Sequence, residues 1–501
     1  MLQLSKILKS REEWKYKAIQ RGDDIREFRK SQKRYQERII ELKRANGELQ
    51  EAAKDKKKLP SQQMNSMEET ETPTQFVNLS ETEQVRALCT LLTISTVVSY
   101  RSIPRILELL KLTSPLKLNW NPNFTSIINW TMRLGLGLLK QVQPITKPWV
   151  AIIDHSIDIG TKKTMVVLRI TVEALSIRGS AVQLQDCQCI GLSISEKVTG
   201  ETIFPELEKI FAQSGQPVAI IKDADATLNK GVRLYSEKQE KFIPSIDDIG
   251  HTIANALKSQ FEKTKAYKRF IALVSYGAKC LRQTDLAFIT PPKLRSKGRF
   301  QSISKLGEWG VRMLEVFAVK GRTPKGSMLE RIRNVFPDLI KSRAFIKHFA
   351  LTNKIACEVM SILKNKGLNK LTYTQCYNLS KKLPRNSKVK KRLQAWLKQT
   401  IEVQKQLGGS LPLIVSSDII ESLFGKFKYT ITRNPKADMN RSVLLIPTLC
   451  GHLDAEMITQ SLNQVSCREL ETWEKDNIPY TVRKKRLAFF KEEENPKIGN
   501  L

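Results

Sequence analysis

The spacing of hydrophobic positions changes along the chain and divides it into regions of different predicted structure. Residues 1–57 and 81–146 have apolar positions every three or four residues, which predicts helices, and a polar segment at 58–80 with two prolines separates them. Residues 147–265 contain short apolar runs typical of strands, alternating with helical segments. Residues 266–410 return to helical spacing with no series of strands. Residues 411–465 contain one further apolar run and helices, and residues 466–501 are a charged amphipathic tail.

The region 147–265 has the predicted order β-β-β-α-β-α-β-α. Two of its strands, VAII before Asp154 and VAIIK before Asp223, contain no alternation of polar residues. Such strands are typical of positions covered on both faces, so we expect both in the centre of a sheet. Asp158 and Asp225 lie close by and are alternatives, but Asp154 and Asp223 follow their strands directly. An acid at the end of a strand is also a common cap or turn residue.

A third acid of interest lies far downstream, in LIVSSDIIESLFGKFK. The two serines and the aspartate of SSD are typical of a helix start, which puts Glu421 in the first turns of a helix. Lys428 lies seven residues further on, on the same helix face. A solvated lysine and a DNA-contacting lysine are both compatible with that position.

The charge balance indicates a polyanionic partner. The chain has 84 Lys and Arg against 50 Asp and Glu, a net charge of +34, which favours nucleic acid. No apolar run approaches the ~18 residues of a membrane span, and the N-terminus lacks the apolar core of a signal peptide. The eight cysteines are scattered, which is typical of free thiols in a reducing compartment. We therefore expect a cytoplasmic protein that binds DNA and no membrane.

Three helical or basic segments are candidates for contacts with DNA or with a second copy. A heptad pattern from Phe28 onwards in residues 1–57 predicts either a coiled coil that pairs protomers or a basic helix packed on its own domain. Residues 81–146 predict either a helix-turn-helix DNA binder or a three-helix bundle. Their last helix, with Thr125 as its expected N-cap, would expose Ser126, Asn129 and Arg133. The basic loop with Lys297 and Arg299 either contacts phosphates or is solvated.

The order of elements resembles the RNase H fold, a mixed five-stranded sheet flanked by helices. In that fold the first strand lies beside the fourth, and the last helix approaches both. The chain, over roughly residues 85–465, resembles DDE transposases of bacterial insertion sequences, with a helical insertion before the last catalytic helix. The resemblance implies that residues 147–265 and 411–465 are two parts of one catalytic core, that 266–410 is the insertion, and that the mostly helical N-terminal region binds DNA.

The resemblance also implies roles for individual residues. Asp154, Asp223 and Glu421 match the three carboxylates that bind two Mg²⁺ or Mn²⁺ ions, for which oxygen ligands are suited. His251 follows Asp248 in the D-x-x-H pattern of several transposase groups, in which the histidine lies by the scissile phosphate; the pair could equally be a helix cap and its first turn. Lys428 has the E-x6-K spacing of one large subset, but the Tyr and Arg of that subset are replaced here by Ile414 and Ser417.

The function that we expect is therefore a DNA transposase of the bacterial nucleoid. It would cleave the transposon end with divalent ions and join the freed 3′ hydroxyl to target DNA. Its partners would be terminal inverted repeats, target DNA and at least one further copy of itself. The alternatives are an RNase H-like nuclease without strand transfer and a DNA-binding derivative without catalysis.

Overall fold

The computed structural model describes residues 79–479, apart from short gaps, and a few isolated residues beyond. The gaps are 97, 114–119, 160–161, 179–181, 240–242, 294–299, 301–302, 320–322, 408–411 and 432–439. The possible coiled coil at 1–57, nearly all of the linker at 58–80, and both Lys297 and Arg299 lie outside the described residues. Within the described ranges, no helix combines the length and the hydropathy needed to cross a bilayer.

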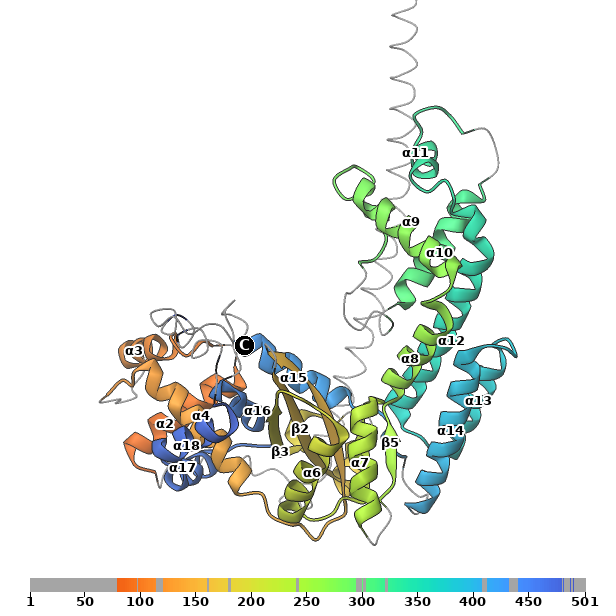
Figure 1. Ribbon diagram of the computed structural model, residues 1–501. Coiled ribbons are helices and arrows are strands. Elements are labelled where there is room, and N and C mark those ends of the chain that lie inside the picture. Colours follow the sequence, from red (N-terminus) through yellow and green to blue (C-terminus); the bar gives the residue numbers. More distant parts are fainter. Residues whose placement is uncertain are drawn as a thin grey trace, which may run out of the picture. The chain divides into compact units, whose positions relative to one another are not determined.

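A five-stranded mixed sheet forms the centre of the α/β region (Figure 1). Its strands lie in the order β3-β2-β1-β4-β5; β1 pairs antiparallel with β2 and parallel with β4, and β4 pairs parallel with β5. This order confirms the predicted RNase H-like fold, with the first strand beside the fourth. The strands are β1 (Trp149–Ile159), β2 (Lys162–Thr171), β3 (Gln188–Ser195), β4 (Ala219–Lys222) and β5 (Ser245–Asp247).

Helices cover both faces of the sheet, as the apolar strands predicted. Along β1, Ala151 and Ile153 face a core shared with α6 (Gly200–Ser214) and α7 (Ala226–Lys238). Val150 and Ile152 face the opposite core, which is completed by α4 (Phe124–Lys140), α8 (Ile249–Phe261), α15 (Asp418–Ile431) and α16 (Leu445–Thr448). Because successive strand residues point to opposite faces, the parity of a residue tells which helices it meets.

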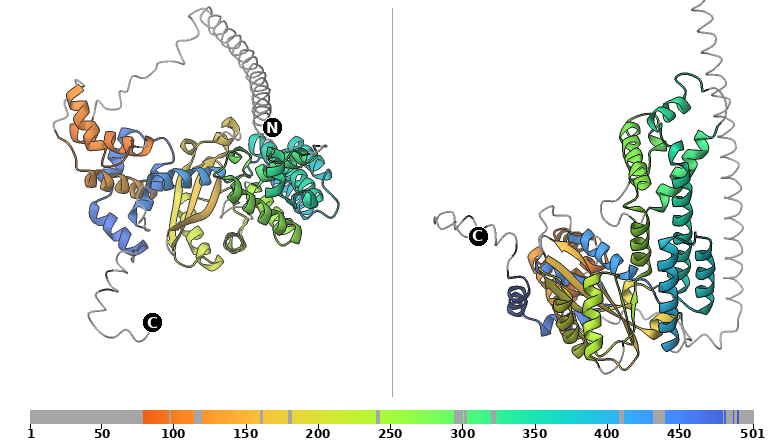
Figure 2. Two further views of the ribbon diagram at one scale, coloured as in Figure 1. Left: turned by 90° about the horizontal axis from the view of Figure 1, so that it is seen from above. Right: turned by 45° about the vertical axis from the view of Figure 1, so that its right-hand side comes forward.

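The described part of the predicted insertion is helical, with one isolated bridge between Leu368 and Leu413. Helices α12 and α13 pack on each other, and α14 packs on both α13 and α8 (Figure 2). Contacts with α8, which follows directly from the sheet, therefore join the insertion to the core. Its helices are α9 (Lys265–Leu281), α10 (Ser304–Phe317), α11 (Met328–Val335), α12 (Arg343–Lys366), α13 (Lys370–Lys381) and α14 (Lys388–Gln406).

The helices predicted at 81–146 share a core with helices from the other end of the chain. Apolar side chains of α2 (Glu81–Ser95), α3 (Ile103–Thr113) and α4 pack against α17 (Ala455–Gln464). Helix α18 (Cys467–Asn477), which lies in the predicted charged tail, also packs on α4. The N-cap of α4 is Asn123, whose side chain accepts a hydrogen bond from the backbone N–H of Thr125, so the expected cap at Thr125 is wrong.

The expected exposure of Ser126, Asn129 and Arg133 is also wrong, since all three are half-buried. The Arg133 guanidinium donates hydrogen bonds to the carbonyl oxygens of Leu462 and Val465. The Asn129 carbonyl accepts a bond of 2.9 Å from the guanidinium of Arg441. Periodicity identified a helix with one polar face. It did not reveal that a distant segment of the chain forms hydrogen bonds with the side chains of that face.

Candidate active site

The register of β1 and β4 brings Asp154 and Asp223 side by side. Ile153 pairs with Lys222 in the last parallel step, and each acid is the next residue along the chain. Asp223 directly follows β4, as predicted, but Asp154 lies within β1, so the expectation that it follows its strand is wrong. Asp154 has the same parity as Val150 and Ile152, so its side chain lies on the sheet face covered by α8 and α15. Asp154 is buried, whereas the Asp223 side chain is about one-quarter exposed, at 24%. One acid is thus buried and its neighbour is partly exposed to solvent.

The segment before α15 delivers Glu421 to the same place. The carbonyl of Val415 accepts a bond of 3.0 Å from the backbone N–H of Ile249, at the start of α8. The Asp248 carboxylate accepts one of 2.7 Å from the backbone N–H of Ser417. Helix α15 then begins at Asp418 and packs on β1, with Glu421 in its first turn and half-exposed. The starts of α8 and α15 are therefore fixed to each other next to the strand ends.

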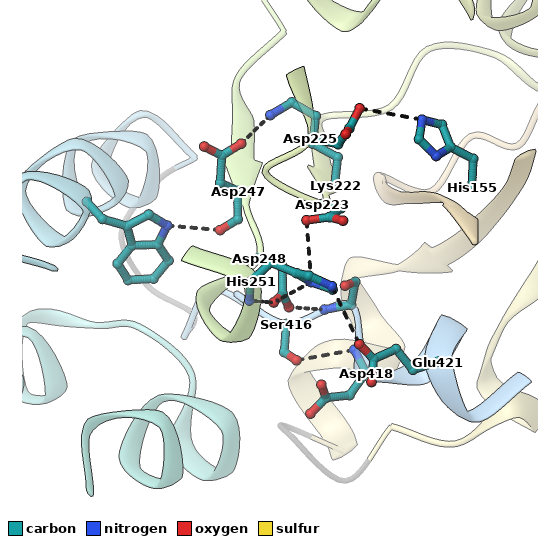
Figure 3. A network of polar contacts seen from close by, with 12 residues as sticks. His155, Lys222, Asp223, Asp225, Asp247, Asp248, His251, Ser416, Asp418 and Glu421 are labelled. Carbon is teal, nitrogen blue, oxygen red and sulfur yellow. Dashed lines mark hydrogen bonds and ion pairs between the residues drawn. The ribbon is translucent and has the colours of Figure 1, made fainter. Parts of the chain in front are cut away.

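His251 lies between two of the three carboxylates (Figure 3). Its Nδ1 is 3.5 Å from Oδ1 of Asp223, and its Nε2 is 3.8 Å from Oε1 of Glu421. Asp248, the N-cap of α8, holds the ring: its Oδ1 accepts a 2.7 Å bond from the His251 backbone N–H and lies 3.1 Å from Nδ1. The two readings of D-x-x-H, helix cap and site histidine, are thus both compatible with the geometry.

Ionisation of the site reflects a surplus of carboxylates. Burial, reinforced by the charge of Asp223, raises the pKa of Asp154 to about 7. Burial also raises the pKa values of Asp223 and Glu421, with partial compensation from His251. Burial alone would lower the pKa of His251, but the bond to Asp248 and the charges of Asp223 and Glu421 raise it to about 9. A cation entering this site would relieve the repulsion among the acids.

The two alternative aspartates have different positions. Asp225 caps α7, where its Oδ1 accepts bonds from the backbone N–H groups of Thr227 at 2.8 Å and Leu228 at 3.4 Å. Its carboxylate lies 3.8 Å from His155, whose parity places it on the opposite sheet face. Asp158 lies four residues beyond Asp154 on β1, paired with Lys163 of β2. Asp225 thus faces His155, whereas Asp223 faces His251.

A buried lysine that sequence reasoning missed fixes the strand ends. Lys222, the last residue of β4, is 3% exposed, and its ammonium contacts the carboxylate of Asp247 and the side-chain carbonyl of Asn229. The indole N–H of Trp396 in α14 donates a 2.9 Å bond to the backbone carbonyl of Asp247. Since Asp223 and Asp248 each follow a member of this ion pair, the pair positions both. The signal in the sequence was a lysine inside an otherwise apolar run.

The donor atoms suit a hard divalent cation, although the side chains are not drawn together around one point. Within the described ranges, no group of three His, Cys, Asp or Glu side chains is already arranged to hold an ion. His251 instead lies between Asp223 and Glu421. Mg²⁺ and Mn²⁺ prefer carboxylate oxygens, which are what this site offers. Lys428 is exposed on α15, two turns beyond Glu421.

Comparison with known proteins gave few matches. No family model matches the chain, and no curated protein matches it. Among solved structures, it is similar to the Drosophila P element transposase strand transfer complex. The two chains are 12% identical, with a TM-score of 0.40, and the similarity covers 76% of this chain and 95% of the other. A similarity at this level carries no argument about function, so the inference rests on the fold and on the site itself.

Proposed function

We propose that the protein is a DNA transposase that cleaves and joins phosphodiester bonds with the carboxylates Asp154, Asp223 and Glu421. The observation that supports this proposal is proximity: two adjacent parallel strands and the start of α15 carry three acids, far apart in sequence, and His251 lies between Asp223 and Glu421. The net charge of +34 supports a nucleic-acid substrate, which an acidic site would otherwise repel.

Each side chain has a distinct part in the proposed chemistry. Asp154, Asp223 and Glu421 would hold two Mg²⁺ or Mn²⁺ ions, which, when bound, activate the attacking hydroxyl and stabilise the leaving oxygen. Asp223 and Glu421 are partly exposed and can meet a phosphate entering from solvent. His251, as a cation between them, would orient and neutralise the scissile phosphate. Lys428 would contact the DNA backbone further along α15.

A pair of variants tests the assignment of the second acid. Asp223→Asn should reduce Mn²⁺-dependent cleavage of a labelled duplex copied from the flanks of the gene by about a thousandfold, because a lost ligand weakens transition-state stabilisation by several kcal/mol. Asp225→Ser is the matched control, since serine also caps a helix and should leave cleavage within a few-fold of the parent. Equal activity of Asp223→Asn and the parent would contradict the proposal.

Joining separates a transposase from a nuclease of the same fold. The same duplex, supplied with a pre-cut 3′ end, should be joined to a plasmid by the parent protein and not by Asp223→Asn. Cleavage by the parent without any joined product would favour the nuclease. Unchanged behaviour of every carboxylate variant would favour a DNA-binding protein without catalysis.

A further inference from the structure

A long stretch of the insertion contains cations and no acids. Residues 359–401 contain no Asp or Glu, although a chain with 50 acids among 501 residues would carry about four in a segment of this length. The same segment contains eleven cationic side chains: Lys364, Lys366, Lys370, Lys381, Lys382, Arg385, Lys388, Lys390, Lys391, Arg392 and Lys398. Solvated helices of soluble proteins usually mix both signs of charge. The depletion therefore indicates a surface selected for one sign.

Most of these side chains are exposed on two packed helices. Helices α13 and α14 pack on each other, and α14 turns its apolar face to α8. On α14, Lys388, Lys391 and Lys398 are exposed at helical spacing. We call the nine exposed cations of this segment the basic surface: Lys366, Lys370, Lys381, Lys382, Arg385, Lys388, Lys391, Arg392 and Lys398.

Carboxylates do not neutralise the basic surface within the described part of the chain. The ion pair that this segment forms there is Lys364 with Asp418, at 2.6 Å, and Lys364 is half-buried outside the basic surface. The ammonium of Lys388 donates to a backbone carbonyl, that of Ser259. On the opposite side of the sheet the pattern is different, because Lys230 pairs with Glu201 and Lys238 with Glu208. Among the described residues, carboxylates thus pair with basic residues of α7, but not with those of the basic surface.

Three contacts join this segment to the candidate site. Lys364 holds Asp418, which lies three residues before Glu421 in α15. Backbone hydrogen bonds of 2.8 Å connect Leu368 with Leu413, just before that helix. The indole of Trp396 donates to the carbonyl of Asp247. The next residue, Asp248, contacts the ring of His251 (Figure 3). These contacts fix the segment to the elements that carry Glu421 and His251.

We propose that the basic surface binds the backbone of duplex DNA next to the bond that is cut. The aromatic residues of α13 favour a duplex over a single strand. Tyr373 and Tyr377 stack on each other, with ring centroids 5.7 Å apart, and both are half-buried. Lys381 covers the Tyr377 ring at 5.3 Å. Rings that already contact each other and a lysine have little free surface on which an unstacked base could stack. The surrounding cations can contact phosphates.

The test compares two variants of equal charge in the full-length protein. In the first, Lys381, Lys382, Lys391 and Arg392 are changed to glutamine. In the control, Lys209, Lys230, Arg233 and Lys238 of α6 and α7 are changed to glutamine, which lowers the net charge equally. Binding to an end-labelled linear duplex is followed by fluorescence anisotropy over a series of salt concentrations, in EDTA. Thermal unfolding checks that both variants fold.

The slope of log K against log [salt] is negative, and in the basic-surface variant its magnitude should be smaller by about 3 to 4. Each lost phosphate contact reduces that magnitude by about 0.9. The control should keep the slope of the parent. Equal slopes for the two variants would overturn the inference. In a parallel series with single-stranded DNA, a larger decrease in slope than for the duplex would also overturn it. The inference rests on the proposed function only for the nature of the partner. Binding in EDTA is independent of catalysis, so failed cleavage with an altered slope would count against the proposed function alone.

Discussion

Asp154→Asn should abolish divalent-dependent cleavage and, in the absence of divalent ions, make the protein more stable at pH 8. Burial and the neighbouring Asp223 raise the pKa of Asp154 from 3.8 to about 7. Between these two values the unfolded chain has released a proton that the folded protein retains. The free energy of unfolding therefore falls as pH rises from about 4 to about 7, and it keeps this lower value at higher pH. Asparagine removes this effect, and at about 1.4 kcal/mol for each pKa unit the gain should be about 2 to 4 kcal/mol.

Chemical denaturation in EDTA at several pH values measures this effect. The difference in unfolding free energy between Asp154→Asn and the parent should be largest at pH 8 and should shrink towards pH 4. Mg²⁺ at pH 8 should raise the melting temperature of the parent and leave that of Asp154→Asn unchanged, since an ion stabilises only the folded state that binds it. Asp225→Ser should respond to Mg²⁺ as the parent does. A destabilised Asp154→Asn protein with a normal response to Mg²⁺ would refute the assignment.

Asp248→Ala should have the largest effect on stability, a loss of about 3 kcal/mol or more. The carboxylate is 2% exposed and accepts hydrogen bonds from the backbone N–H groups of His251 and Ser417. Alanine removes the N-cap of α8 and leaves the Ser417 donor and the His251 ring without their acceptor. Burial alone would raise the pKa of Asp248, but its bonds with His251 and Ser417 hold it below the usual value. This carboxylate is therefore ionised in the folded protein.

The same change should lower the pKa of His251. Asp248 contributes the largest part of the attraction that raises this pKa to about 9. A histidine with a raised pKa stabilises the fold below its unfolded value of about 6.5, and that contribution is lost as pH rises to about 9. Asp248→Ala should remove much of this pH dependence, as measured by denaturation and by NMR titration of the imidazole. Asp248→Asn is the milder control, because an amide oxygen can still cap α8. An unchanged pKa of His251 in Asp248→Ala would show that Asp248 does not hold the ring.

The sequence, with the fold that it resembles, was sufficient to predict the sheet and the proximity of two of its acids. Val150–Ile153 and Ala219–Ile221 are apolar on both parities, and only a strand covered on both faces requires this. Asp223 directly follows such a strand, whereas Asp154 lies within β1. The two are neighbours because β1 lies beside β4, as the resemblance to the RNase H fold predicted. Glu421 could be connected to them only through the family resemblance, because no local pattern reports a contact across the whole insertion.

Features that depend on packing between distant segments could not be predicted. Arg133 has the pattern of an exposed basic residue, yet its partners are carbonyl groups more than 300 positions away. In the sequence, Lys222 is a lysine at the end of an apolar strand. Only the structure reveals that Asp247 and Asn229 compensate its buried charge. Asp248 is the N-cap of α8 and His251 lies in its first turn, so their mutual contact was predictable, whereas the contact of His251 with Glu421 was not.

The position of α15 after the insertion has a consequence for biosynthesis. About 200 residues separate Asp223 from Glu421 along the chain, and at 5 to 20 residues per second a ribosome needs roughly 10 to 40 s to cover them. During that interval the nascent chain already carries β1 and β4 but lacks the helix that packs on β1. Until the insertion has emerged, the helices available to cover that face are α4 and α8, without α15 and α16. Incomplete chains ending before α15 therefore contain two of the three acids, and under the proposed function we expect a truncated product not to cut DNA in the cell that makes it.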